Sequence, residues 1–181
     1  MKKADLLIAH SQGVYNIKVD GRANFECAPP LRNLSSNLEK NFQKISIDLT
    51  GCTGMDSTFM GVLAMLGLQV RAQGAVEIVN ASIDNQHLLQ GLGIHDLFNF
   101  VTRDTPLTTP AETSQFVAAE PTTNAIEKAE TVLTAHDTLI KANEDNRQKF
   151  EKVVEFAQKD LDKLKAEEQQ KADDEHRNNQ P

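Results

Sequence analysis

Apolar residues recur with two different spacings over the first hundred residues. Runs with strand-like alternation, or short apolar runs of strand length, are found at 5–9, 14–19, 45–49, 76–79 and 97–101. Apolar residues at helical spacing are found between them, at 31–42, 59–70 and 83–92. This mixture of strand and helix periodicity predicts an α/β domain.

The segment 45–70 is the most informative part of this pattern. Its strand-like start is followed by two glycines, which favour a tight turn. Asp56, Ser57 and Thr58 are residues of the kind that cap helix N-termini, and no proline interrupts the apolar run Phe59–Val70. We therefore predict a strand, a tight loop and a helix, with Ser57 at or beside the helix N-terminus.

The position of Ser57 has a chemical consequence. A helix N-terminus presents unpaired N–H groups and a partial positive charge, so a phosphate group on Ser57 would be favoured there. Asp56 could hold a metal ion or orient the hydroxyl group in a kinase site. The alternative is that Asp56 or Ser57 only caps the helix, which contributes about 1 kcal/mol. Local chemistry alone favours the cap.

The run IDLTGCTGMDSTFMGVL (47–63) resembles the signature of STAS domains, the fold of bacterial anti-sigma factor antagonists. That signature is an apolar strand ending in Asp, a short loop, Asp-Ser-Ser/Thr-Gly-Leu-Gly and an apolar helix. The matching positions are Asp56, Ser57, Thr58 and Gly61. Phe59 and Met60 stand where the family has Gly-Leu.

The resemblance implies a fold and a function. The fold is a STAS-like mixed sheet of four or five strands covered by helices, over residues 1–101. The serine after the aspartate is the one that a partner kinase phosphorylates, which assigns that role to Ser57. The neighbours of this phosphorylation site would be Asp56, Thr58, Asp48 at the strand end, and Asn24, which stands where the family often has Asp.

The predicted helix 59–70 is apolar on nearly all sides, which requires burial of both faces or a covering partner. We predict a partner interface that includes Phe59, Met60 and Met65, since methionine adapts its shape to a partner. The alternative cover is the chain's own C-terminal extension.

The last eighty residues differ from the domain. Residues 102–123 are rich in Thr and Pro and are predicted to be a linker, in which Phe116 and Val117 could dock on the domain. From 124 to 170, steps of three and four between apolar residues predict a long helix, a coiled coil or a helical hairpin. Residues 171–181 are a polar tail, which we expect to be disordered.

Three polar residues interrupt the apolar seam of this helical segment, at His136, Asn143 and Arg147. They either set the register of a coiled coil or mark a break between two helices that fold back on each other. We favour self-association or a partner helix through residues 124–168 over folding back.

Composition excludes several classes of protein. The net charge is −7 and no cluster of basic residues lacks neighbouring acids, so we expect no nucleic-acid binding. No apolar run reaches the ~18 residues of a membrane helix, and the N-terminus lacks the features of a signal peptide, so we expect a cytoplasmic protein. No residue pattern indicates a metal site, a cofactor or a catalytic set, so we expect no enzyme.

Two functional hypotheses remain. In the first, the protein is an anti-sigma factor antagonist: it binds an anti-sigma factor/serine kinase, phosphorylation at Ser57 releases it, and a phosphatase restores it. In the second, it is a non-phosphorylated STAS adaptor or scaffold in a transport or sensory complex, assembled through the C-terminal helix. The second is favoured by Phe59, whose ring could hinder the approach of a kinase to Ser57.

Overall fold

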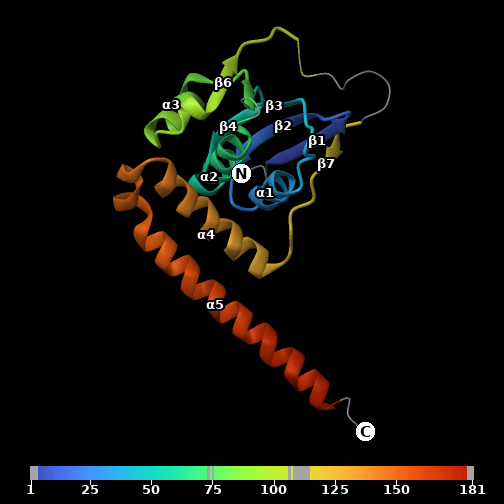
Figure 1. The fold of residues 1–181 in the computed structure, drawn as a ribbon, viewed down its shortest axis with the longest axis vertical. Coiled ribbons are helices and arrows are strands. Elements are labelled where there is room, and N and C mark those ends of the chain that lie inside the picture. Colours follow the sequence, from blue (N-terminus) through green and yellow to red (C-terminus); the bar gives the residue numbers. More distant parts are fainter. Residues whose placement is uncertain (1–3, 73, 75, 106, 108–114, 179–181) are drawn as a thin grey trace.

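The computed structural model describes residues 4–72, 74, 76–105, 107 and 115–178. A sheet forms the centre of the N-terminal part, and two C-terminal helices lie beside it (Figure 1). The second of these helices extends away from the sheet toward the C-terminus (Figure 1).

The sheet is mixed, as predicted, because it contains both parallel and antiparallel strand pairs. In the described residues they are β1 (Asp5–Ser11), β2 (Val14–Ala23), β3 (Lys44–Asp48), β4 (Cys52–Met55), β5 (Val76–Val79), β6 (Phe98–Val101) and β7 (Val117–Ala118). Their order is β6-β5-β3-β2-β1-β7, and β4 pairs with the second half of β2. Strand β1 is antiparallel to β2 and β7, and the other pairs are parallel.

This sheet has seven strands in the described part of the chain, not the four or five that we predicted. One additional strand arises because the chain turns aside after Asp48 and resumes pairing with β2 at Cys52. That segment was predicted as a turn only. The other is β7, where residues of the predicted linker pair with β1 through Ile8 and Val117.

Helices connect the parallel strands. They are α1 (Ala28–Ser36), α2 (Ser57–Val70) and α3 (Ile83–Gly91), followed by a 3₁₀ turn η1 (His95–Leu97). Helix α1 is shorter than predicted, because it ends at the C-cap Asn37, and Leu38 and Phe42 pack against the core from the following loop. Leu88 belongs to the apolar run 83–92 that predicts this helix but is exposed, since the buried face of α3 carries Asn85 and Leu89.

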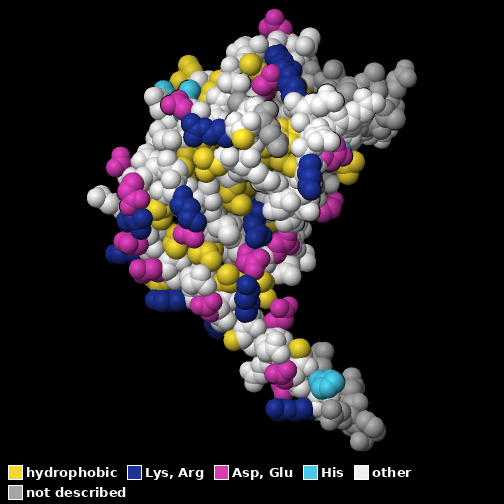
Figure 2. Space-filling view, in the orientation of Figure 1, with side chains coloured by type: hydrophobic (Ala, Val, Ile, Leu, Met, Phe, Trp, Pro, Cys, Tyr) yellow, Lys and Arg dark blue, Asp and Glu magenta, His cyan; other side chains and the backbone are white. Residues whose placement is uncertain are grey.

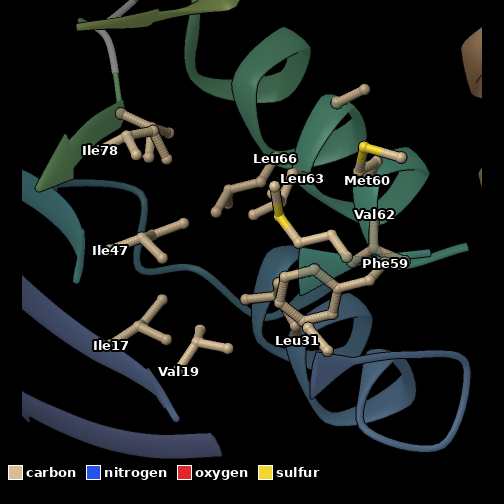
Figure 3. Packing of buried hydrophobic residues seen from close by; sticks show 14 of the residues in the cluster. Ile17, Val19, Leu31, Ile47, Phe59, Met60, Val62, Leu63, Leu66 and Ile78 are labelled. Atoms are coloured by element: carbon tan, nitrogen blue, oxygen red, sulfur yellow. The ribbon is translucent and has the colours of Figure 1, made fainter. Parts of the chain in front are cut away.

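The core lies between the sheet and helices α1 and α2 (Figure 3). The strands contribute β-branched side chains to it, which suit a pleated surface: Ile17, Val19, Ile47 and Ile78. The helices contribute Leu31, Phe59, Val62, Leu63 and Leu66. The apolar residues of α2 that recur at the 3.6-residue helical period thus form one face, and this face packs on the sheet.

The second half of the predicted linker contacts the domain. Phe116 lies beneath the ammonium group of Lys18, 4.3 Å from the ring centre, and Val117 pairs in β7. The backbone N–H of Ala119 also donates to the carbonyl oxygen of Leu6 at 2.7 Å. Residues 106 and 108–114 of the predicted linker lie outside the described residues.

The C-terminal segment is a helical hairpin, the alternative that we had favoured less. Helix α4 (Ala125–Ala142) and helix α5 (Arg147–Asn178) are joined by a 3₁₀ turn η2 (Glu144–Asn146). The break falls at two of the polar seam residues, whose side chains bond within the turn. Oδ1 of Asn143 accepts the N–H of Asp145 at 3.1 Å, and Arg147 pairs with Glu144. Asn146 is fully buried, and its amide group donates to the carbonyl oxygens of Leu92 and Leu139.

Helix α5 also continues further than expected. Residues 171–178 of the predicted tail belong to it, whereas 179–181 lie outside the described residues. Within the described chain, no helix combines the length and hydrophobicity that crossing a membrane requires. Cys27 and Cys52 are free and buried, and burial raises the pKa of both thiols.

Candidate functional site

Asp56 is the N-cap of α2 and uses both carboxylate oxygens. Its Oδ1 accepts the N–H of Phe59 at 2.8 Å, which is the hydrogen bond expected of a cap. Its Oδ2 accepts the N–H of Phe25 at 2.8 Å, from the loop between β2 and α1. Asp56 therefore fixes the start of α2 and ties it to the neighbouring loop.

Ser57 is the first residue of α2, in agreement with the sequence analysis, and it is half-buried. Its Oγ lies 2.9 Å from Nε2 of His136, on helix α4. The other ring nitrogen of His136, Nδ1, lies 2.8 Å from the carbonyl oxygen of Val132. A carbonyl oxygen only accepts, so Nδ1 carries a proton, and in the neutral ring Nε2 accepts the hydroxyl proton of Ser57.

His136 is a site residue that the sequence analysis did not identify as one. Only 3% of its surface is exposed, and its ring contacts the ring of Phe150 on α5, edge to face, at 5.0 Å between centres. The signal in the sequence was a polar residue in an otherwise apolar seam. What the seam could not reveal is that His136 faces Ser57, because 79 residues separate the two.

Helices α2 and α4 approach each other closely at Gly61. A Cβ atom added to Gly61 would lie 2.5 Å from the carbonyl oxygen of Ala135 and 2.7 Å from its Cβ. Only glycine allows this approach, since real Cβ atoms do not come so near to a backbone. Ala135 is itself fully buried. The second apolar face of α2 is therefore covered by the chain's own C-terminal extension.

Polar contacts hold α4 against α1 as well. The amide group of Asn33 donates to Oε1 of Glu127 at 2.6 Å, and Arg32 lies 3.6 Å from Glu130. Hydrogen bonds from Thr122 and then Asn33 lower the pKa of Glu127. These contacts lie at the exposed edge, and such contacts contribute about 0–1 kcal/mol each.

Helix α5 completes the hairpin. Its Lys165 lies 2.9 Å from Glu130 of α4, and the ammonium group of Lys149 donates to the carbonyl oxygen of Gly91 at 3.0 Å. The visible surface of the hairpin carries interspersed acidic and basic side chains around apolar ones (Figure 2).

The other predicted neighbours of Ser57 make hydrogen bonds within their own turns. Oδ1 of Asn24 accepts the N–H of Glu26 at 3.0 Å. Oδ1 of Asp48 accepts the N–H and the hydroxyl group of Thr50 at 2.9 and 2.5 Å. Asn24 lies in the same loop as Phe25, which Asp56 binds. Thr58 is buried beside Ser57 in the first turn of α2.

The predicted interface residues differ in their exposure. Phe59 is fully buried and faces the core (Figure 3), because it shares the sheet-facing side of α2 with Leu63 and Leu66. Met60 is buried, and Met65 is half-buried. Phe59 is therefore a core residue in this conformation, and only Met65 of the three is partly accessible.

The described residues contain no group of three or more His, Cys, Asp and Glu side chains that could hold a metal ion. Asp56, which we considered as a metal ligand, has both carboxylate oxygens in backbone hydrogen bonds. What the site offers is the Ser57 hydroxyl group at a helix N-terminus, between two helices that are distant in the sequence.

Comparison with known proteins agrees with this fold. The family model described as the STAS domain matches residues 6–106, and no curated protein matches the chain. STAS domains mediate protein–protein interaction, as regulators or as scaffolds. The matched segment contains the sheet from β1 to β6 and helices α1, α2 and α3. Since the match spans more than half of the 181 residues, the chain belongs to the STAS domain family.

Proposed function

We propose that the protein is a partner-switching regulator of the anti-sigma factor antagonist type. In this proposal the α2 surface binds an anti-sigma factor that is also a serine kinase, and phosphorylation of Ser57 ends that contact. A phosphatase reverses the modification. The protein would act in the cytoplasm, as a substrate of the kinase and without an enzymatic activity of its own.

The observation that supports this proposal most is the place of the Ser57 hydroxyl group. It lies at the N-terminus of α2 and at a helix–helix contact, 2.9 Å from His136. A phosphate group there would add about −1.5 to −2 charges and three acceptor oxygens to the contact. Any partner that packs on α2 beside Ser57 would respond to such a change.

The experiment has two parts. Mass spectrometry of the protein purified from its own cells should find phosphate on Ser57. The kinase that copurifies with it should bind the Ser57→Ala variant and lose affinity for Ser57→Asp. Ser82→Ala and Ser82→Asp are controls, because Ser82 is an exposed serine at a helix N-terminus, the N-cap of α3. Equal binding by Ser57→Ala and Ser57→Asp would contradict the proposal.

A scaffold role is the second candidate, and one observation favours it. The Ser57 hydroxyl group already has a partner in His136, and α4 covers α2 beside it. Assembly would then use the outer face of the hairpin, where Phe156 is 69% exposed. Recovery of a transporter or sensory subunit with the wild-type chain, but not with Phe156→Ser, would favour this role over the switch.

A further inference from the structure

The contact between Ser57 and His136 is held rigidly. The imidazole ring is fixed by Ser57 at Nε2 and by the carbonyl oxygen of Val132 at Nδ1, and Phe150 packs on it. With only 3% of its surface exposed, the ring has little space for another rotamer. The ring therefore moves away from Ser57 only if α4 moves.

The backbone of α4 is fixed one turn further along α2. Gly61 lies four residues after Ser57, and Ala135 directly precedes His136, so both contacts belong to the same crossing of the two helices. Because the two backbones already touch at Gly61, α4 has no room to shift toward α2 while it tilts away from Ser57. Packed interfaces of this kind tend to be docked or separated, without intermediate positions.

Phosphorylation of Ser57 would remove the existing hydrogen bond. When a kinase transfers the γ-phosphoryl group of a nucleoside triphosphate, the O–H bond of Ser57 is replaced by an O–P bond. The hydroxyl proton leaves, and the nucleoside diphosphate is released. Nε2 of neutral His136, which accepted that proton, would then face oxygen atoms that are also acceptors. With the Ser57 side chain in its present rotamer, 2.9 Å from Nε2, the phosphorus and its three oxygens would need the space that the ring now fills.

The attraction between a phosphate group and the N-terminus of α2 does not counteract this effect. That attraction is about 0.3–1 kcal/mol at exposed sites. It acts on Ser57 whether or not α4 is docked, so it does not stabilise the docked state over the open one. The carboxylate of Asp56, held in place as the cap, lies beside Ser57 in both states.

We propose that the docked α4–α5 hairpin and a phosphate group on Ser57 exclude each other, which makes the hairpin an autoinhibitory cap over the serine. The proposal deepens the proposed function and depends on it for the source of the phosphate. By thermodynamic reciprocity, docking of the hairpin disfavours the phosphorylated form as much as phosphate disfavours docking. The docked hairpin also slows phosphorylation because α4 covers the Ser57 hydroxyl group. A partner that replaces α4 must present a helix with a small residue opposite Gly61 and an acceptor for the Ser57 hydroxyl group.

The test is hydrogen exchange of the full chain with phosphoserine encoded at position 57. We expect the amides of α4 to exchange at least roughly tenfold faster than in the unmodified chain, whereas those of β3 and β5 stay protected. Alkaline phosphatase should then restore slow exchange in the same sample, which shows that the chain had opened and not misfolded. Because the phosphate is encoded, the result does not depend on any kinase.

Two controls separate a phosphate effect from a general effect of charge. Phosphoserine at position 82 places the same group at the start of α3, whose Ser82 is exposed, and should leave α4 protected. Ser57→Ala removes the hydrogen bond without adding volume, so the hairpin should stay docked.

Unchanged or slower exchange of α4 with phosphoserine at position 57 would overturn the proposal, because it would mean that His136 binds the phosphate in place. Loss of protection in β3 and β5 that phosphatase does not reverse would also overturn it, since the phosphate would then disrupt the domain and not the hairpin. Failure of the proposed function differs from both: Ser57 would carry no phosphate in cells, whatever the encoded group does.

Discussion

Helices α2 and α3 begin in the same way and end up in different surroundings. Each follows a strand, after one residue for α2 and three for α3, and each is capped by the side chain of the residue before it. Asp56 accepts the N–H of Phe59 at 2.8 Å, and Ser82 accepts that of Asn85 at 3.1 Å. Both N-termini present the backbone N–H groups that suit an anion.

The difference lies in what covers them. Helix α3 leaves Ile83 71% exposed at its start, whereas α2 is enclosed between the sheet and α4. The hydroxyl group at the start of α2 therefore contacts a second element of the chain, and the one at the start of α3 serves only as a cap. A helix N-terminus can act as a switch only where another surface depends on it.

The largest effect should come from the enclosed side chain in the first turn of α2. Phe59→Ala removes a fully buried ring and should lower the free energy of unfolding by about 3–5 kcal/mol. Ile83→Ala, in the first turn of α3, should change it by less than about 0.5 kcal/mol, as exposed substitutions usually do. Urea denaturation of both variants measures the two values. Similar losses would contradict the comparison.

Substitutions at two glycines test how closely α4 packs on α2. Gly61→Ala puts a methyl group 2.5 Å from the Ala135 carbonyl oxygen and should weaken docking of α4 by about 1–3 kcal/mol, despite the better helix propensity of alanine. Gly91→Ala, at the end of α3, meets nothing within 4 Å and should be neutral or stabilising by up to about 1 kcal/mol. Hydrogen exchange of α4 in both variants is the measurement. Protection of α4 in Gly61→Ala would show that the crossing adapts.

Removal of the two N-cap side chains should change the free energy of unfolding by amounts that differ less. Asp56→Ala loses the cap and also leaves the N–H of Phe25 without its acceptor, which together should cost about 2 kcal/mol. Ser82→Ala loses the cap alone, at about 1 kcal/mol. Thermal denaturation distinguishes them, and equal losses would mean that the bond from Phe25 contributes little.

The smallest expected effect concerns Glu77 of β5, the strand that connects α2 with α3. Burial acts to raise the pKa of its carboxyl group, but hydrogen bonds from Lys44 and Ser46 and the charge of Arg103 hold it below the ordinary value of 4.5. A lowered folded pKa means stability that is fully present above about pH 4.5 and lost as pH falls through the folded value.

Glu77→Gln should therefore destabilise the protein by about 1 kcal/mol at neutral pH, since one partly buried ion pair contributes little more. The difference from the wild type should shrink as the pH is lowered from 5 to 3 in urea titrations, roughly the range over which such a carboxyl group titrates. A difference that stays constant with pH would show that the charge of Glu77 is not the cause. Phe59→Ala is the control, because its loss should not depend on pH.

The domain could be predicted from the sequence because its patterns are local. The alternation of apolar residues near Ile47 identifies a strand, and their helical spacing after Ser57 identifies a helix. The residues that cap the helices directly precede them in the sequence. Predictions of exposure were less accurate where they required knowledge of neighbours. Leu88 is apolar at a helical position but lies off the buried face of α3, and the ring of Phe59 lies in the core.

What the sequence by itself determined is the strand β3, the helix α2 that begins at Ser57, and the apolar character of α2 on all sides. What only the tertiary structure decided is which surface covers the second face of α2. The apolar seam of a heptad pattern can be buried equally well by a second chain, by a partner helix or by the segment folding back on its own domain, because the hydrophobic effect is not directional. The close approach at Gly61 and the pairing of Ser57 with His136 select the last of these, since they depend on contacts between residues more than seventy positions apart.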